Sequence, residues 1–145
     1  MDVLEFTGDH KYLSNFYIVE FVWDGIIWQH SEAAYQAAKT LDRATRLAFS
    51  RMKPGESKRA GKTVSLRSDW EEVKYDIMHA IVLAKFKQNP ELLRRLLATG
   101  TAHLEEGNNH NDRIWGVCPP RSSEGRNWLG KILMSVRDQM QPVSK

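Results

Sequence analysis

The sequence predicts a mainly helical fold: a single compact multihelical domain over residues 1–145 with a small N-terminal β-hairpin. Three observations support this prediction. The chain has 145 residues, the usual size of one domain, and 41% of them are hydrophobic. Apolar side chains recur at helical spacing in the second half of the chain. Near its start, a two-residue turn signal lies between two short apolar segments.

The hairpin is expected at residues 21–23 and 26–28. Both segments are apolar and rich in side chains that favour strands, and they flank Asp24-Gly25. The two central residues of a tight hairpin turn need positive φ, which Asp and Gly adopt more readily than most residues. The pattern therefore predicts two antiparallel strands.

Three short helices are expected after the hairpin, at residues 32–40, at 43–52 and up to Gly61. Ser31 and Asp42 precede the first two helices. Such side chains accept hydrogen bonds from the free backbone N–H groups of a helix start, so both residues are predicted N-caps.

A longer helix should follow, because Ser68 and Glu71 have the spacing of a capping box. Its apolar positions recur at helical spacing and are Trp70, Val73, Ile77, Ile81 and Ala84. The helix should end near Asn89, which can cap a further helix over residues 90–98 that stops before Gly100.

A long irregular stretch, residues 105–126, separates these helices from a last one that Asn127 can cap. The apolar stripe of the last helix is Leu129, Ile132, Leu133, Val136 and Met140. Long loops in compact domains commonly carry function, so we expect part of the site there.

Positive charge is concentrated in residues 39–67, although the whole chain has a formal net charge of only +3. The basic residues of this segment are Lys39, Arg43, Arg46, Arg51, Lys53, Lys58, Arg59, Lys62 and Arg67. Only Asp42 and Glu56 oppose them. Such asymmetry suits a phosphate, a pyrophosphate or a nucleic-acid backbone, although a pair of solvated helices would look the same.

Several site classes are not expected. Cys118 is the one cysteine, so the sequence cannot form an intrachain disulfide or a cysteine-based zinc site. His110 with Asp112 is too little for a metal centre, and we expect neither metal nor cofactor. No apolar run approaches the length of a membrane span, and we expect a soluble, cytoplasmic protein without a membrane partner.

The helix after Ser31 carries the first candidate chemistry. At about 100° per residue, Glu32, Tyr35, Gln36 and Lys39 share one face, opposite a face of alanines. The Glu32 carboxylate could act as a general acid or base. The Lys39 amine could bind phosphate or, if desolvated, attack a sugar carbon as a nucleophile. Spacing alone equally fits the polar side of an amphipathic helix.

Two further segments offer candidate contacts. Asp112 could orient a ribose hydroxyl or a water molecule, and Trp115 could stack on a base, although a polar loop anchored by one Trp would have the same composition. Gly125 to Gly130 begin the last helix, where exposed N–H groups suit an anion. Ordinary capping by Asn127 explains that segment equally well.

These pieces together resemble the NADAR family, which includes the YbiA-like N-glycosidases. The matching blocks run in the family's order and are Leu13-Ser-Asn-Phe16, Trp28, Ser31-Glu-Ala-Ala-Tyr-Gln-Ala-Ala-Lys39, Lys58-Arg-Ala-Gly61, Arg67-Ser-Asp-Trp70, Lys85-Phe86, Asp112-Arg-Ile-Trp-Gly116 and Gly125-Arg-Asn-Trp-Leu-Gly-Lys-Ile-Leu-Met134. Ala33 departs from the pattern, because the family often has His or a bulky residue after the motif glutamate.

The resemblance implies hydrolysis of a ribosyl C–N bond, in riboflavin-pathway intermediates or in ADP-ribosylated guanine of nucleic acid. It implies that Glu32 is the catalytic acid and that Lys39, Trp70 and Asp112 match further functional positions. We expect Glu32, Lys39 and Asp112 to be catalytic. The expected ligand contacts are Asn15, Phe16, Tyr35, Lys58, Arg59, Trp70, Trp115, Gly116 and Asn127.

Three functions remain open at this point. A hydrolase needs a pocket that gathers Glu32, Lys39, Asp112 and Trp115. A non-catalytic ADP-ribose or nucleotide reader would use the same pocket and would bind without turnover. A general nucleic-acid-binding protein would bind nucleic acid through the basic segment alone, and its affinity would depend steeply on salt concentration.

Overall fold

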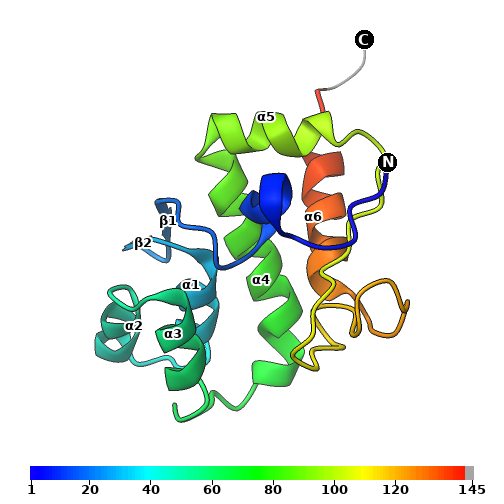
Figure 1. The fold of residues 1–145 in the computed structure, drawn as a ribbon. Helices are drawn as coiled ribbons and strands as arrows, with labels where there is room; N and C mark the ends of the chain where they lie inside the picture. Colours follow the sequence, from blue (N-terminus) through cyan, green and yellow to red (C-terminus); the bar gives the residue numbers. More distant parts are fainter. Residues whose placement is uncertain (143–145) are drawn as a thin grey trace. The chain divides into compact units, whose positions relative to one another are not determined.

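The computed structural model describes residues 1–142, and the chain falls into two compact units. The central unit is Asn15–Asn89, and the terminal unit joins Met1–Ser14 to Pro90–Lys145. The fold is mainly helical with one two-stranded hairpin, as expected (Figure 1). None of the described helices is long and apolar enough to span a membrane.

The central unit contains the hairpin and four helices: β1 (Phe21–Trp23), β2 (Ile26–Trp28), α1 (Ser31–Ala37), α2 (Arg43–Phe49), α3 (Pro54–Ala60) and α4 (Trp70–Lys87). Helix α1 packs against α2, α3, α4 and β2 (Figure 1). All seven residues of α1 are buried. The short helix α1 is therefore the core of this unit.

The hairpin forms where the sequence predicts it. Its strands are antiparallel, and Phe21 pairs with Trp28. Asp24 and Gly25 have φ of 56° and 68°, the positive values that such a turn requires. The Trp28 indole donates to the Trp23 carbonyl oxygen at 2.9 Å, which ties the two strand ends together.

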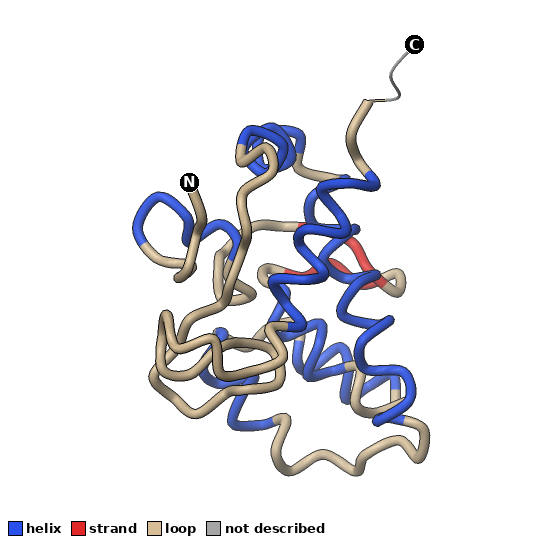
Figure 2. Tube along the Cα trace, turned by 90° about the vertical axis from the view of Figure 1, so that its right-hand side faces the viewer, coloured by secondary structure: helices blue, strands red, loops and turns tan. Residues whose placement is uncertain are grey.

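The terminal unit contains a 3-10 helix that the sequence did not indicate, η1 (Gly8–Leu13), together with α5 (Pro90–Ala98) and α6 (Trp128–Gln139). Much of the rest is irregular, and loops are tan in Figure 2. Backbone hydrogen bonds join Val3 to His103 and Glu105, so the start of the chain lies along the beginning of the long loop. Gly100 has φ of 64° and ends α5, as expected.

The cap of α1 differs from the prediction. Ser31 is the first helical residue, and the N-cap is His30, whose Nδ1 accepts a hydrogen bond from the Ala33 N–H at 3.2 Å. The His30 ring also reaches the Met52 carbonyl oxygen at 2.7 Å. Serine is the usual cap residue, but the His30 imidazole satisfies two backbone groups at once. The helix ends at Ala37, three residues earlier than expected.

Helix α4 begins at Trp70, but the predicted capping box does not form. Its N-cap is Asp69, without a side-chain capping bond, because the Asp69 carboxylate pairs with Arg67 at 2.6 Å. Glu71 instead pairs with Lys74 on the next turn at 2.6 Å. Charged partners therefore outcompete the local capping pattern.

The buried face of α4 includes Trp70 and Ile81 from the predicted apolar stripe, together with Met78, Val82, Lys85 and Phe86. Val73, Ile77 and Ala84 are half-buried. Burial lowers the pKa of Lys85 to about 7, and its ammonium group lies over the Tyr17 and Phe86 rings. A lysine on the buried face shifts the stripe from the one that hydrophobicity alone indicates.

The other helix ends agree in part with expectation. Asp42 caps α2, and its carboxylate accepts from the Thr45 N–H at 3.1 Å. Helix α2 ends at Phe49 instead of continuing to residue 52. Asn127 occupies the N-cap position of α6 but makes no capping bond with its side chain.

The His30 cap makes a pH-dependent stability testable. Burial lowers the pKa of His30 below its ordinary value of 6.5, and the bond to the Met52 carbonyl partly opposes this effect. Below pH 6.5 the unfolded chain therefore binds more protons than the folded one, and the free energy of unfolding should fall until the pH passes the folded-state pKa. The capping variant His30→Asn lacks this titration and should show a flatter profile.

Urea unfolding between about pH 7.5 and pH 5 measures the difference between the two proteins. The other histidines are common to both, so their contributions cancel in the comparison. Equal slopes for wild type and His30→Asn would show that the cap does not titrate in this way.

Candidate functional site

Glu32 is held from two sides at the start of α1. Its backbone N–H donates to the Asn15 carbonyl oxygen at 3.0 Å, and its Oε2 accepts from Gln36 Nε2 at 2.9 Å. The residue is only 9% exposed. A solvated polar face, the alternative that spacing left open, is therefore excluded. A buried carboxyl group with little solvent is suited to proton transfer.

Lys39 follows the end of α1 and is half-buried. Its Nζ donates to the Gly61 carbonyl oxygen at 3.3 Å. Burial lowers the pKa of Lys39, the charge of Glu32 opposes this effect, and the cations Lys74 and Lys62 reinforce it. The central unit thus places a carboxyl group and a partly desolvated amine in electrostatic contact.

Aromatic side chains line the same helix. The rings of Tyr35 and Trp70 lie 5.2 Å apart between centroids at 52°, and both are almost fully buried. Phe16 is exposed, and the Lys58 ammonium lies 5.9 Å from its ring centroid. Asn15, which accepts the Glu32 N–H, joins the Phe16 segment to the start of α1.

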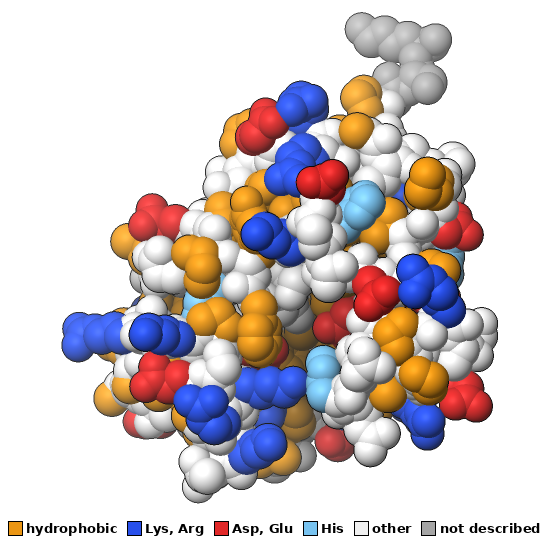
Figure 3. Space-filling model, viewed as in Figure 1, with side chains coloured by type: hydrophobic (Ala, Val, Ile, Leu, Met, Phe, Trp, Pro, Cys, Tyr) orange, Lys and Arg blue, Asp and Glu red, His pale blue; other side chains and the backbone are white. Residues whose placement is uncertain are grey.

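Part of the basic segment is neutralised inside the central unit. Arg43 and Arg46 both pair with Asp24, and Arg67 pairs with Asp69. Across residues 1–142, no ion pair joins a carboxylate to Arg51, Lys53, Lys58, Arg59 or Lys62. Figure 3 shows Lys and Arg side chains gathered over the region of α2 and α3. These uncompensated cations remain available to an anionic ligand.

Asp112 organises the long loop of the terminal unit. Its Oδ1 accepts from the N–H groups of Ile114 and Trp115 at 3.1 and 2.9 Å. Asn108, which sequence reasoning missed, holds Asp112 in turn through bonds to its N–H and its carbonyl oxygen at 3.1 and 2.9 Å. Asn108 is buried, and its position in a polar run offered no periodic signal.

Of the remaining predicted contacts in the terminal unit, Gly116 and Asn127 are buried and Trp115 is half-buried. Trp115 meets Trp128 edge to face at 5.4 Å between centroids. A side chain at Gly116 would come within 2.3 Å of the Glu106 carbonyl oxygen, so only glycine fits there. Asn127 donates to the Leu104 carbonyl and accepts from the Glu106 N–H, and both polar groups of its side chain are engaged.

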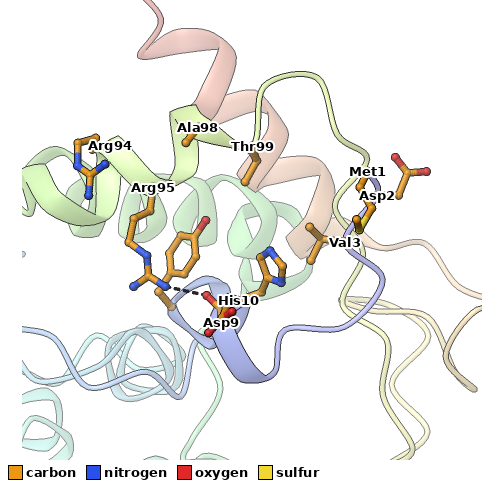
Figure 4. Close-up of a pocket in the computed structure, with 10 residues that line it drawn as sticks. Met1, Asp2, Val3, Asp9, His10, Arg94, Arg95, Ala98 and Thr99 are labelled. Atoms are coloured by element: carbon orange, nitrogen blue, oxygen red, sulfur yellow. Dashed lines mark hydrogen bonds between the residues drawn. The ribbon is translucent and has the colours of Figure 1, made fainter.

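A cavity of about 530 Å³ lies within the terminal unit (Figure 4). It is lined by Met1, Asp2, Val3, Asp9, His10, Tyr12, Arg94, Arg95, Ala98 and Thr99. The Arg95 guanidinium stacks over the Tyr12 ring and donates to the Asp9 carbonyl oxygen at 2.7 Å. None of the predicted site residues lines this cavity. In residues 1–142, no cluster of three or more His, Cys, Asp or Glu side chains is placed to hold a metal ion.

The predicted site residues divide between the two units. The central unit holds Asn15, Phe16, Glu32, Tyr35, Lys39, Lys58, Arg59 and Trp70. The terminal unit holds Asp112, Trp115, Gly116 and Asn127. Within the central unit, direct contacts or charge interactions link Glu32 to Asn15 and Lys39. Arg59 is exposed on α3 and extends toward Gly55, one turn earlier.

The chain is similar in sequence to a known domain family and to named proteins. Residues 5–141 match the sequence model of the NADAR domain. The riboflavin biosynthesis protein VVA0006 of Vibrio vulnificus (strain YJ016) is 36% identical over 138 residues, which are 92% of this chain and 36% of that protein. The N-glycosidase YbiA of Escherichia coli (strain K12) is 38% identical over 137 residues, which are 92% of this chain and 84% of YbiA.

The NMR structure of the E. coli protein YbiA has a TM-score of 0.83 to this chain and 36% sequence identity. The match covers 97% of this chain and 83% of that one. The chain therefore spans most of YbiA but only about a third of the Vibrio protein. The match to the NADAR domain runs through segments of both units.

The bonds of Asp112 predict how the loop responds to substitution. Asp112→Ala removes the acceptor for the Ile114 and Trp115 amides, whose hydrogen exchange should accelerate about 5- to 10-fold, because a hydrogen bond contributes about 1 kcal/mol. Asp112→Asn keeps a side-chain oxygen and should keep both amides protected. Asp138→Ala, an exposed substitution on α6, serves as the control. Equal protection in Asp112→Ala would show that the loop does not depend on this carboxylate.

Proposed function

The chain belongs to the NADAR family, and we propose that it is an N-glycosidase that hydrolyses the bond between C1 of a phosphorylated ribose and a base nitrogen. The observation that carries this proposal is the buried Glu32, held by Asn15 and Gln36 and coupled to the charge of Lys39. YbiA of E. coli, of which this chain covers 84%, is named an N-glycosidase, which supports the reaction class.

Cleavage of a ribosyl C–N bond builds positive charge at C1 while the base nitrogen gains electrons. A carboxyl group can donate its proton to the departing nitrogen and then, as a carboxylate, take a proton from the attacking water. The products are a ribose phosphate with a hydroxyl group at C1 and the free base. Glu32 suits this cycle because its burial keeps bulk water from competing for the proton.

Phosphate recognition is assigned to the cations without carboxylate partners. Lys58, Arg59 and Lys62 lie on α3 or just after it, and none forms an ion pair within the described chain. Arginine suits bidentate phosphate recognition, and lysine acts as a point charge. Phe16, with Lys58 over its ring, offers an exposed aromatic surface for stacking.

Two substrate classes fit this proposal. A phosphorylated ribosyl-pyrimidine of riboflavin synthesis is supported by the name of the Vibrio relative, of which this chain spans only about a third. ADP-ribose on a modified guanine base is supported by the number of uncompensated cations, because a pyrophosphate needs more than one. A reader that binds the same ligands without turnover is the non-enzymatic alternative.

The deciding experiment incubates the chain separately with both substrates and follows release of the free base and the sugar phosphate. Turnover of one substrate identifies its class. Tight binding without product would favour the reader. Weak binding of both, together with strongly salt-dependent affinity for unmodified nucleic acid, would overturn the proposal.

Glu32→Gln should keep the fold and lose about 100- to 10,000-fold in turnover, because the amide keeps the shape but cannot exchange a proton with the base or water. Steady-state rates on the accepted substrate measure the effect, and circular dichroism checks the fold. Glu105→Gln, in the terminal unit, is the matched control. A Glu32→Gln rate close to wild type would remove Glu32 from the mechanism.

Lys39 has a testable covalent role. Its lowered pKa favours the neutral amine, which can add to C1 of the ring-opened substrate, where C1 is double-bonded to the base nitrogen; the protonated base then leaves, and a Schiff base between Lys39 and C1 remains for water to hydrolyse. Borohydride added during turnover would reduce this bond to a stable amine, and intact-mass analysis should show a sugar-phosphate adduct on Lys39 that Lys39→Arg lacks. Normal turnover without an adduct would leave Lys39 as a charged binder, with water as the nucleophile.

A further inference from the structure

We propose that Gln36 is a positioning residue for Glu32, and that Gly61 is a glycine because it must leave room for the Gln36 amide. This inference deepens the proposed function and rests on the role of Glu32 in it. Three observations carry it: a hydrogen bond within α1, a close approach of the chain after α3, and an unsatisfied amide oxygen.

The hydrogen bond joins two residues one helical turn apart. Gln36 Nε2 donates to Glu32 Oε2 at 2.9 Å, and positions i and i+4 lie on one face of a helix. Gln36 is 6% exposed and Glu32 is 9% exposed, so water does not replace this bond easily. The donor therefore fixes one oxygen of the carboxyl group.

Gly61 holds the amide from the other side. A Cβ atom at this position would lie 1.9 Å from Gln36 Oε1 and 2.6 Å from Gln36 Cδ, so the Gln36 amide would have to move away from its present place. Gly61 has φ of −62°, which any residue adopts, so the backbone does not require glycine here. Glycine is needed at position 61 because the Gln36 side chain occupies the space that a Cβ atom would fill. The Gly61 carbonyl oxygen also accepts a hydrogen bond from Lys39, so Gly61 contacts both Gln36 and Lys39.

The cost of this arrangement argues for a functional reason. Gln36 Oε1 is buried and has no hydrogen-bond partner within residues 1–142. A buried unsatisfied acceptor destabilises the fold, and an apolar side chain of similar length would avoid this cost. What the amide supplies in return is the donor to Glu32.

The charged groups in this part of the central unit differ in their effect from the neutral Gln36 donor. Glu32 interacts with the charge of Lys39, which follows the end of α1, and Lys39 in turn interacts with Lys62, after α3, and Lys74, on α4. Lys58 of α3 faces Phe16, while Arg43 and Arg46 of α2 pair with Asp24. Among these cations, Lys39 acts on Glu32 through its charge. The Gln36 amide is the neutral group that sets its orientation.

Two variants and two matched controls test the proposal. Gln36→Met keeps the length of the side chain and removes the donor, and Gly61→Ala displaces the amide. Gln29→Met, at an exposed glutamine, and Gly55→Ala, where a Cβ meets only an ordinary contact at 3.5 Å, are the controls. Both test variants should lose about 10- to 100-fold in kcat with KM nearly unchanged, because a small displacement of a catalytic group costs that much. Both controls should match wild type.

A second measurement is independent of turnover. The side-chain carbon signal of Glu32, assigned by its absence in Glu32→Gln, reports the titration of this group by NMR. Loss of a donor to the carboxylate should raise the pKa of Glu32 in Gln36→Met, and Gln29→Met should leave it unchanged. If Gly61→Ala does not fold, Gln36→Met carries both readouts.

The outcomes separate the two proposals. A wild type without turnover of either substrate overturns the proposed function, while the NMR titration still tests Gln36. An active wild type with unchanged kcat and unchanged Glu32 titration in Gln36→Met overturns the positioning role. An increase in KM alone, with kcat retained, also overturns it, because that result assigns Gln36 to substrate binding.

Discussion

The central unit depends on the complete burial of a seven-residue helix. Helix α1 is too short to be stable alone in water, so its stability comes from the elements packed around it. Ala33, Ala34 and Ala37 allow that packing, because their small side chains let neighbouring backbones approach closely. The same burial brings the Glu32 carboxyl group and the Gln36 amide together within the helix, which joins the structural core to the candidate chemistry.

Electrostatics follows from this constraint. A carboxyl group in the core is costly unless charge and hydrogen bonds compensate it, and here an amide donor and the Lys39 ammonium do so. The basic residues of segment 39–67 then fall into two groups, those paired with carboxylates and those without such a partner in residues 1–142. Asp24 and Asp69 neutralise three of its arginines and fix local structure, while the cations of α3 remain uncompensated. The sequence showed the charge of this segment, but only pairing distances show which part a ligand can use.

The terminal unit solves a different problem, the ordering of a long irregular loop. Asn108, Asp112 and Asn127 bond backbone groups that no regular helix or strand satisfies. Asp112 therefore shapes the loop whatever else it does. Polar side chains that bind the backbone look the same in sequence as polar side chains that bind a ligand, so the sequence does not distinguish the role of Asn108 from that of Asp112.

The sequence by itself determined the helical class, the hairpin with its Asp24-Gly25 turn and the motif helix, because turn chemistry and periodicity act between neighbouring residues. Tertiary structure decided what depends on competition and space. His30 displaced Ser31 as the cap because its ring also reaches a distant carbonyl. Gly61 became meaningful only where it meets an amide 25 positions earlier in the chain. Such contacts join residues far apart in sequence, and no local pattern contains the distance between them.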